Sequence, residues 1–317
     1  MGHRSLRRPL AVAVFIVASL ALASLTVRGG RDGAGADADA AEQTAVHASP
    51  APSEPGSAGA GAGVSVAPSP DGRRSVRVGP NRQVAGDLSD PQKKDIAMRL
   101  VSSAENSTLD WTAQYAYIED IHDGRGYTGG VVGFCSGTGD MRAVVERYTR
   151  AVPGNRLAAY LPALKRVNGS ASHAGLDPNF TSDWRAAAAD PAFRAAQDAE
   201  RDRMYFNPAL SQAKQDGLRV LGQFAYYDAI VMHGANGLAK LRRAAAAKAP
   251  PPARGGDEAA YLEAFLDARV DLMESERGHD DDSRVNDAQR VFLAARNFDL
   301  DPPLHWRVYG DTYDIAA

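Results

Sequence analysis

The segment Ala104–Asp140 constrains the fold most, because a helical pattern gives way there to a glycine-punctuated hairpin pattern. Upstream, Ser89-Asp90-Pro91 provides a capping side chain and then a proline, as at the start of a helix. Four apolar residues follow at helical spacing: Ile96, Leu100, Val101 and Ala104. Downstream, extended segments at residues 115–118 and 127–134 flank Asp123-Gly124, which predicts a tight turn between two strands.

Glu105 lies four residues after Val101 and therefore at the edge of the predicted buried face. Partial burial disfavours a charged carboxylate, so this position suits a general acid at neutral pH. A solvated glutamate at a frayed helix end explains the same spacing equally well. The spacing alone leaves both interpretations open.

Asp123 lies in the predicted turn, where a carboxylate is solvated and ionised, as a general base must be. The alternative is that Asp123 serves only to form the turn, because Asp-Gly is common in hairpins. The two carboxyls together are more informative than either alone. One carboxyl that is partly buried and another that stays charged correspond to the acid and the base of a glycosidase.

Three long motifs carry a specific resemblance: LVSSAENSTLDW, YIEDIHDGRGYTGGVVGFCSGTGD and GQFAYYDAIVMHG. They closely resemble glycoside hydrolase family 46, the secreted endo-chitosanases found in Streptomyces-type bacteria, and the resemblance runs from about Asp87 to the C-terminus. It implies a lysozyme-like fold, with two lobes around a central substrate cleft. The implied reaction is endo-hydrolysis of β-1,4 links between glucosamine units of chitosan, with inversion at the anomeric carbon.

By this resemblance Glu105 is the general acid, Asp123 is the general base, and Thr128 helps to hold the attacking water. Inversion requires the two carboxyls to lie roughly 6.5–9.5 Å apart, or somewhat more in an open cleft, to leave room for that water. Polar residues of the same segment are the expected substrate contacts: Tyr117, Glu119, Arg125 and Asp140. Asp140 is also predicted to begin a helix, and one residue can both begin a helix and contact the substrate.

Two later helical patterns, at residues 211–233 and 257–276, each carry one charge on an apolar stripe: Asp228 and Arg269. A lone buried charge is costly, so these two side chains are expected to form a buried ion pair near the cleft. The alternative is that both lie at stripe edges and reach water. The resemblance adds Arg284 and implies a network that joins the pair to the general acid and tunes its pKa.

The remainder of the chain after Asp140 is predicted to be mostly helical. Together with the short strands this gives an α+β protein, mostly α, with a small β-sheet region beside a helical bundle. Further helices are expected at residues 140–148, 157–167 and 183–205, and the segment 297–313 is expected to be irregular, packing Trp306 and Tyr309 onto the body.

One departure from the family pattern follows Gly234. The segment Ala235–Leu238 is a few residues shorter than the loop that family members carry near the cleft at this point. The shortening does not touch the catalytic pair, but it leaves open the number of subsites and the cleavage pattern.

The N-terminal part predicts export. Residues 1–28 combine a basic start, an apolar run and a small-residue cleavage site, as in a secretory signal peptide; an uncleaved anchor is the alternative. Residues 29–85 are rich in Ala, Gly, Pro and Ser, which predicts a disordered spacer or pro-segment. The catalytic domain is then expected at residues 86–317 of a secreted, extracellular monomer that does not associate with membranes after cleavage.

Charge and cysteine content restrict the partners. Residues 86–317 hold 27 basic and 33 acidic residues, a net charge of −6, which disfavours nucleic acid and suits a cationic polymer such as chitosan. The single cysteine, Cys135, excludes an internal disulfide and is expected to be a small buried residue. The histidines lack metal-ligand spacing, and Gly124-x-Gly126-x-x-Gly129 is not followed by a helix, so no metal or cofactor is expected.

Three other functions remain open on the sequence alone. A peptidoglycan-cleaving enzyme of lysozyme-like fold usually relies on one glutamate, and the segment carrying Asp123 argues against it. A non-catalytic chitosan-binding protein would tolerate loss of Glu105 or Asp123, and both are present. A secreted scaffold protein would leave the charges on the apolar stripes unexplained.

Overall fold

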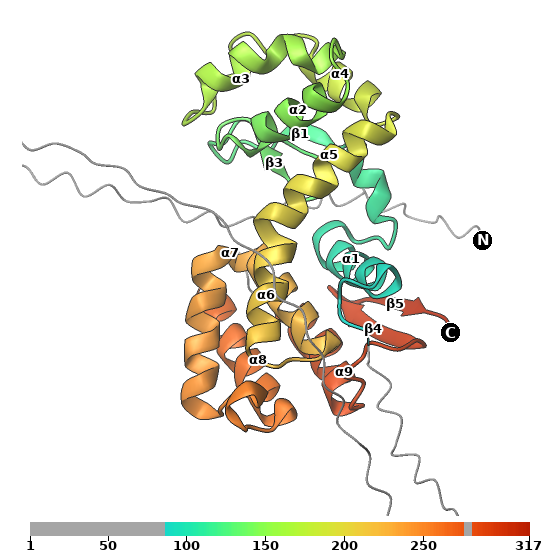
Figure 1. The fold of residues 1–317 in the computed structure, drawn as a ribbon, viewed down its shortest axis with the longest axis vertical. Coiled ribbons are helices and arrows are strands. Elements are labelled where there is room, and N and C mark those ends of the chain that lie inside the picture. Colours follow the sequence, from blue (N-terminus) through green and yellow to red (C-terminus); the bar gives the residue numbers. More distant parts are fainter. Residues whose placement is uncertain (1–85, 276–280) are drawn as a thin grey trace, which may run out of the picture. The chain divides into compact units, whose positions relative to one another are not determined.

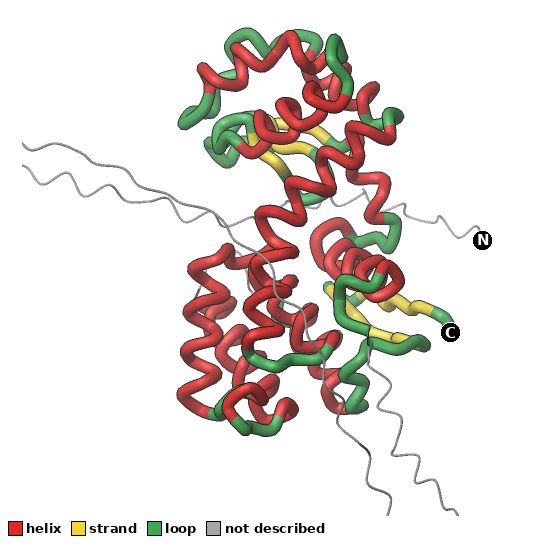
Figure 2. The backbone as a smooth tube through the Cα atoms, in the orientation of Figure 1, coloured by secondary structure: helices red, strands yellow, loops and turns green. Residues whose placement is uncertain are grey.

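The computed structural model describes residues 86–275 and 281–317 (Figure 1). The predicted signal peptide and spacer, together with residues 276–280, lie outside the described residues. Within the described part the protein is mostly helical, with short antiparallel strands in two separate groups (Figure 2). The predicted α+β class, mostly α, is therefore confirmed. No helix among the described residues is both long and apolar enough to span a membrane.

The α-helices are α1 (Pro91–Asn106), α2 (Asp140–Ala151), α3 (Leu161–Val167), α4 (Phe180–Ala187), α5 (Pro191–Arg201), α6 (Asn207–Gln215), α7 (Val220–Lys248), α8 (Glu258–Ser275) and α9 (Arg290–Ala294). Short 3₁₀ helices are η1 (Trp111–Ala116), η2 (Arg156–Tyr160) and η4 (Pro252–Arg254), and π-helical turns are η3 (Asp202–Phe206) and η5 (Val285–Gln289). The strands are β1 (Ile118–Asp120), β2 (Tyr127–Gly129), β3 (Phe134–Cys135), β4 (Leu304–Val308) and β5 (Asp311–Ile315). The sheet orders are β1-β2-β3 and β4-β5, all antiparallel.

Helix α1 forms as its sequence predicts. The Asp90 side chain accepts hydrogen bonds from the backbone N–H groups of Gln92 and Lys93, and Pro91 is the first helical residue. The predicted apolar face is buried, and the helix ends at Ser107, which has a left-handed backbone (φ 51°). Glu105 thus lies in the last turn.

The buried apolar side chains form two clusters. The first takes residues from α1, α6, α7, α8, α9 and β4. The second takes residues from the β1-β2-β3 sheet, α2, α3, α4 and α5. Glu105 belongs to a helix of the first cluster, and the β1–β2 turn that carries Asp123 belongs to the sheet of the second.

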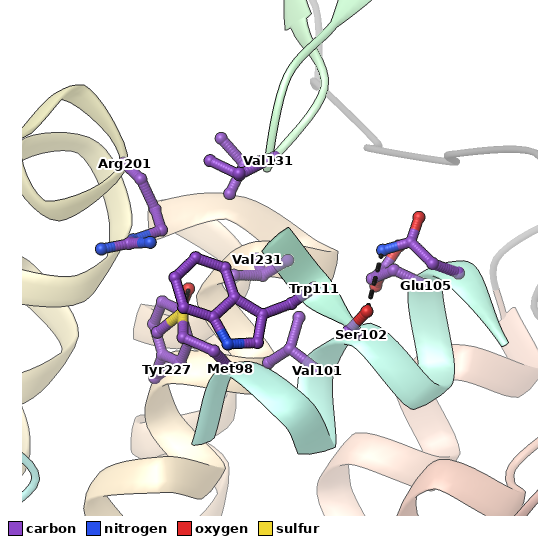
Figure 3. A pocket seen from close by; sticks show the side chains of 11 residues that line it. Met98, Val101, Ser102, Glu105, Trp111, Val131, Arg201, Tyr227 and Val231 are labelled. Carbon is purple, nitrogen blue, oxygen red and sulfur yellow. Dashed lines mark hydrogen bonds between the residues drawn. The ribbon is translucent and has the colours of Figure 1, made fainter. Parts of the chain in front are cut away.

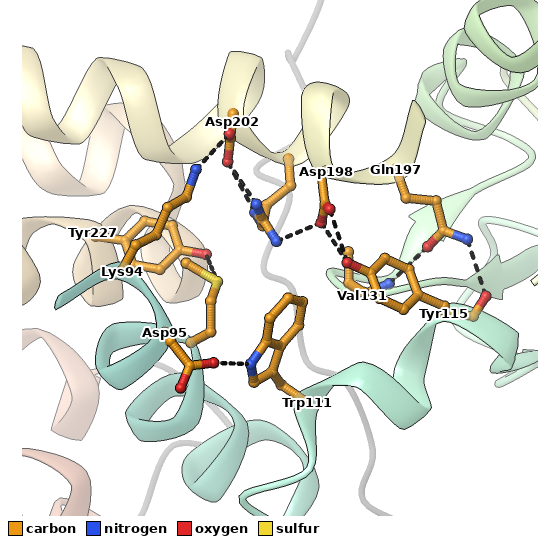
Figure 4. A network of polar contacts seen from close by, with 11 residues as sticks. Lys94, Asp95, Trp111, Tyr115, Val131, Gln197, Asp198, Asp202 and Tyr227 are labelled. Carbon is orange, nitrogen blue, oxygen red and sulfur yellow. Dashed lines mark hydrogen bonds and ion pairs between the residues drawn. The ribbon is translucent and has the colours of Figure 1, made fainter. Parts of the chain in front are cut away.

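A polar network at α5 and η3 joins elements of the two clusters (Figure 4). Its centre is the buried Arg201, which contacts Asp198 at 2.8 Å and Asp202 at 2.9 Å. Asp202 also pairs with Lys94 of α1, and Asp198 accepts a hydrogen bond from the Tyr115 hydroxyl of η1. The network therefore connects the helix of Glu105 to the segment that leads into the sheet.

The sheet differs in detail from the prediction. Tyr115 belongs to the 3₁₀ helix η1, so the first strand begins only at Ile118. The predicted strand 127–134 is divided into β2 and β3, because Gly130 and Gly133 have left-handed backbones (φ 78° and 71°) and turn the chain between them. A side chain at Gly130 would also collide with the Gln197 amide.

The long helices predicted at 183–205 and 211–233 are wrong in their bounds. Asp190 caps α5 with Pro191 as its first residue, which is the same start signal that opens α1, so α4 and α5 are separate helices. Likewise Gly217 (φ 77°) separates α6 from α7. The predicted helices at 140–148 and 257–276 correspond to α2 and α8.

The segment after Gly234 is helical. Helix α7 continues through Ala235–Leu238, and only Gly234 departs from helical geometry (φ 67°, ψ 179°). The stretch identified as a shortened loop is thus helical and follows a local break in α7 at Gly234.

The prediction of an irregular C-terminal segment is wrong. Residues 304–315 form the hairpin β4–β5, in which buried and exposed residues alternate along β4. Trp306 packs as expected: it is buried and donates a hydrogen bond to the Ser103 hydroxyl (3.0 Å). Tyr309 packs only in part: it occupies the turn, donates its backbone N–H to the Ser283 hydroxyl and remains 49% exposed.

Candidate active site

Glu105 is held by an arginine from a distant part of the chain. Its Oε1 lies 2.8 Å from Nη1 of Arg284, and its side chain is 13% exposed. The apolar residues before it anchor α1 in the core, so this last turn has a fixed position. The interpretation as a solvated glutamate at a frayed helix end is therefore wrong.

The ion pair predicted from the two apolar stripes is present. Asp228 Oδ2 lies 2.7 Å from Arg269 Nη1, and both side chains are almost completely buried. Arg284 Nη2 contacts the other oxygen of Asp228, also at 2.7 Å. The contacts run from Arg269 through Asp228 and Arg284 to Glu105. The alternative, with Asp228 and Arg269 at solvated stripe edges, is wrong because neither reaches water.

Charge balance sets the protonation of this network. Burial would raise the pKa of Asp228, but the guanidinium groups of Arg269 and Arg284 outweigh burial and hold that pKa well below its usual range. Burial lowers the pKa of Arg284, but Asp228 and Glu105 outweigh burial and raise that pKa above its usual value, so Arg284 stays charged. Asp228 is thus ionised, and Arg284 presents a permanent positive charge to Glu105.

Sequence reasoning missed Gln289. Its amide nitrogen donates to Asp228 Oδ2 at 2.7 Å, and its Oε1 accepts from Arg269 Nη1 at 3.4 Å. Gln289 reaches the network from the end of the π-helical turn η5, five residues after Arg284. A helical period of 3.6 residues does not place positions i and i+5 together, so the usual pattern gave no signal.

Asp123 lies in the β1–β2 turn, exposed as predicted, with 28% of its side chain accessible. Its Oδ1 accepts the backbone N–H of Arg125 at 3.0 Å, and its Oδ2 accepts Nε of the same residue at 2.7 Å. The turn is built from left-handed residues: His122, Gly124 and Gly126. Arg125 therefore fixes the orientation of the carboxylate, and lone pairs remain for a water molecule.

The predicted substrate contacts on the sheet include an internal pair. The Tyr117 hydroxyl donates to Glu119 Oε1 at 2.5 Å. Glu119 is the register partner of Thr128, whose side chain is fully buried, with Oγ1 3.4 Å from Sγ of Cys135. Burial raises the pKa of the Cys135 thiol to about 11, consistent with the predicted structural cysteine.

Asp140 is the first residue of α2, but Gly139 occupies the capping position. The Asp140 carboxylate instead ties β3 to the helix: its Oδ1 accepts from the backbone N–H groups of Cys135 and Met141, both at 2.8 Å. The Thr138 hydroxyl donates to the same oxygen at 2.6 Å. Burial raises the pKa of Asp140, the largest of several opposing influences.

A pocket adjoins Glu105 (Figure 3). Glu105 and Ser102 of α1 form one side, and Trp111 and Tyr227 lie on the other. Val131 and Val132 of the β2–β3 turn also line the pocket. The sheet that carries Asp123 therefore approaches the last turn of α1, and side chains from both apolar clusters meet at the general-acid candidate. Among the described residues, no group of three or more His, Cys, Asp or Glu side chains could hold a metal ion.

A glutamate fixed at a helix end and an exposed aspartate on the β1–β2 hairpin fit the carboxylate pair of a glycoside hydrolase. The profile described as "Glycosyl hydrolase family 46" matches residues 99–304. The chain belongs to this family.

Known proteins agree with this assignment. A chitosanase from Streptomyces sp. (strain N174) is 61% identical over 250 residues, covering 78% of this chain and 90% of the relative. A chitosanase crystallised with substrate matches with a TM-score of 0.68 and 57% identity, over 72% of this chain and 98% of the other. A Gynuella sunshinyii chitosanase in complex with chitotetraose matches with a TM-score of 0.63 and 33% identity, over 72% and 98%. The lysozyme-like fold implied by the resemblance is confirmed by these structural matches.

Proposed function

We propose that this protein is an endo-acting hydrolase of chitosan that cleaves β-1,4 links between glucosamine units with inversion. The observation that carries the proposal is the pair of carboxylates: Glu105 is fixed by the buried Arg284, and Asp123 is exposed on the hairpin. The family assignment and the chitotetraose complex of a relative support the substrate.

In this mechanism Glu105 protonates the departing glycosidic oxygen. The negative charge left on its carboxylate is then stabilised by Arg284, which already lies 2.8 Å away. Asp228 and Arg269 keep Arg284 in place from the buried side. The network therefore orients the acid and stabilises its conjugate base.

Asp123 acts as the general base in this mechanism. It removes a proton from the water that attacks the anomeric carbon on the face opposite the leaving group. Its contacts with Arg125 orient the carboxylate for this step. Thr128, in the adjacent strand, is proposed to help hold the water.

Substrate recognition is proposed to use acidic side chains near the hairpin. Glu119 and Asp140 would accept hydrogen bonds from glucosamine ammonium groups, with Tyr117 and Arg125 as further contacts. The net charge of −6 over residues 86–317 favours approach of a cationic polymer. The proposal also includes secretion through the segment 1–28 and a monomeric extracellular enzyme.

The stereochemistry of the product tests the mechanism. The wild-type protein should release reducing ends from chitosan, and NMR during early hydrolysis should show the α-anomer first, because a single displacement inverts the β-link. Initial β-anomer would leave a glycosidase but contradict the role of Asp123. Chitosan binding without cleavage would contradict the enzyme assignment and favour a binding protein.

A further inference from the structure

Tyr309 is an exposed aromatic residue near the proposed general acid. Among the described residues, Tyr309 and Val291 are the large apolar residues that remain exposed, with 49% and 43% of each accessible. All three tryptophans, by contrast, are buried or partly buried. Burial in the core therefore does not account for Tyr309.

Turn formation does not explain the tyrosine either. The β4–β5 register pairs Val308 with Asp311, which leaves Tyr309 and Gly310 as a two-residue turn. Both have left-handed backbones (φ 52° and 83°), as in a type I′ turn. The first position of this turn favours Asn, Asp or Gly, and a bulky residue there is disfavoured. Tyrosine thus occupies a position for which its backbone preference is poor.

The turn is attached to the segment that holds Glu105. The backbone N–H of Tyr309 donates to the Ser283 hydroxyl at 2.9 Å. Ser283 is itself fixed by Asp281, which accepts its backbone N–H at 2.8 Å. The next residue, Arg284, contacts Glu105 at 2.8 Å. The hairpin turn and the proposed general acid are therefore connected through two consecutive residues, Ser283 and Arg284.

Electrostatics agree with this placement. Burial raises the pKa of the Tyr309 phenol, Arg284 lowers it, and Glu105, Asp281 and Asp228 raise it. The charges of Glu105 and Arg284 therefore both influence the pKa of the phenol. About half of the residue remains open to solvent.

We propose that the Tyr309 ring is a binding surface for a glucosamine unit of the substrate beside Glu105. A tyrosine ring offers an apolar face to the C–H groups of a sugar and attracts an ammonium group through its negative face. Glucosamine presents both features. The inference rests on the proposed hydrolysis of chitosan and adds a substrate contact that lies on the C-terminal hairpin.

The test compares Tyr309→Asn and Tyr309→Phe in the full-length protein, with glucosamine oligomers of defined length as substrate. Asparagine is favoured in the turn, so Tyr309→Asn should keep or raise the Tm. Without the ring, KM should increase roughly 5- to 10-fold, with a smaller change in kcat. Tyr309→Phe keeps the ring and should keep a KM close to that of the wild type.

Val291→Ala is the matched control, because it removes the other exposed apolar side chain and should leave KM and kcat unchanged. An unchanged KM in Tyr309→Asn, with an active wild type, would overturn the inference. An equal rise in KM for Tyr309→Phe would also overturn it, since the hydroxyl and not the ring would then matter. Failure of the proposed function itself would be distinct, because the wild type would then not hydrolyse the oligomers.

Discussion

Replacing Glu105 with glutamine is expected to lower kcat for chitosan hydrolysis by about 10²- to 10⁴-fold, the range typical of a lost general acid. The amide has nearly the same shape as the carboxyl but cannot deliver a proton to the leaving oxygen. It also removes the charged partner of Arg284, although a neutral hydrogen bond to the same Nη1 stays available. The measurement is the initial rate of reducing-end release at saturating chitosan.

Glu263→Gln is the matched control. Glu263 lies on α8, is about half exposed and pairs with Arg290, so the same chemical change occurs on the surface. This variant should retain the wild-type rate. Binding of chitosan by Glu105→Gln should also persist, because the substitution leaves the other proposed contacts in place. A rate for Glu105→Gln within a few-fold of the wild type would contradict its assignment as the acid.

The fold class could be predicted because it depends on local signals. Asp90-Pro91 and the apolar spacing that follows it produced α1 as expected. Charges on apolar stripes also carried long-range information: a buried charge requires a partner, and this placed Asp228 against Arg269. The location of Glu105 on the edge of a buried helix face followed from the same kind of argument.

The errors have equally physical causes. Helix bounds failed where a start signal fell inside a periodic pattern, as at Asp190-Pro191. The β4–β5 hairpin was missed although Leu304, Trp306 and Val308 alternate with polar residues, which is the pattern of a half-buried strand. Gln289 could not be found because a π-helical turn places it on the network, and such turns leave no periodic trace in the sequence.

The largest expected loss of stability comes from Asp228→Asn. The substitution keeps the side-chain shape but leaves the buried guanidinium groups of Arg269 and Arg284 without their shared carboxylate. Breaking a buried ion pair by removing one partner costs about 3–5 kcal/mol. The free energy of unfolding, measured by urea denaturation with tryptophan fluorescence near pH 6, should fall by that amount.

Asp267→Asn is the control for this measurement. Asp267 pairs with Arg290 on the surface, with 51% of its side chain exposed, and such a pair contributes about 0–1 kcal/mol. A loss in Asp228→Asn no larger than in this control would mean that the buried network adds little to stability.

The pH dependence of unfolding shows whether Asp228 stabilises the protein through its charge or through packing. Because the pKa of Asp228 is lower in the folded protein than in the unfolded chain, the folded state binds fewer protons at this group. Its stabilisation is therefore complete above the unfolded pKa, near 4, and is lost as the pH falls below about 4 towards the folded pKa. The difference in unfolding free energy between wild type and Asp228→Asn should narrow over that range. A difference that stays constant from pH 6 to pH 3 would show that the charge of Asp228 is not what stabilises the site.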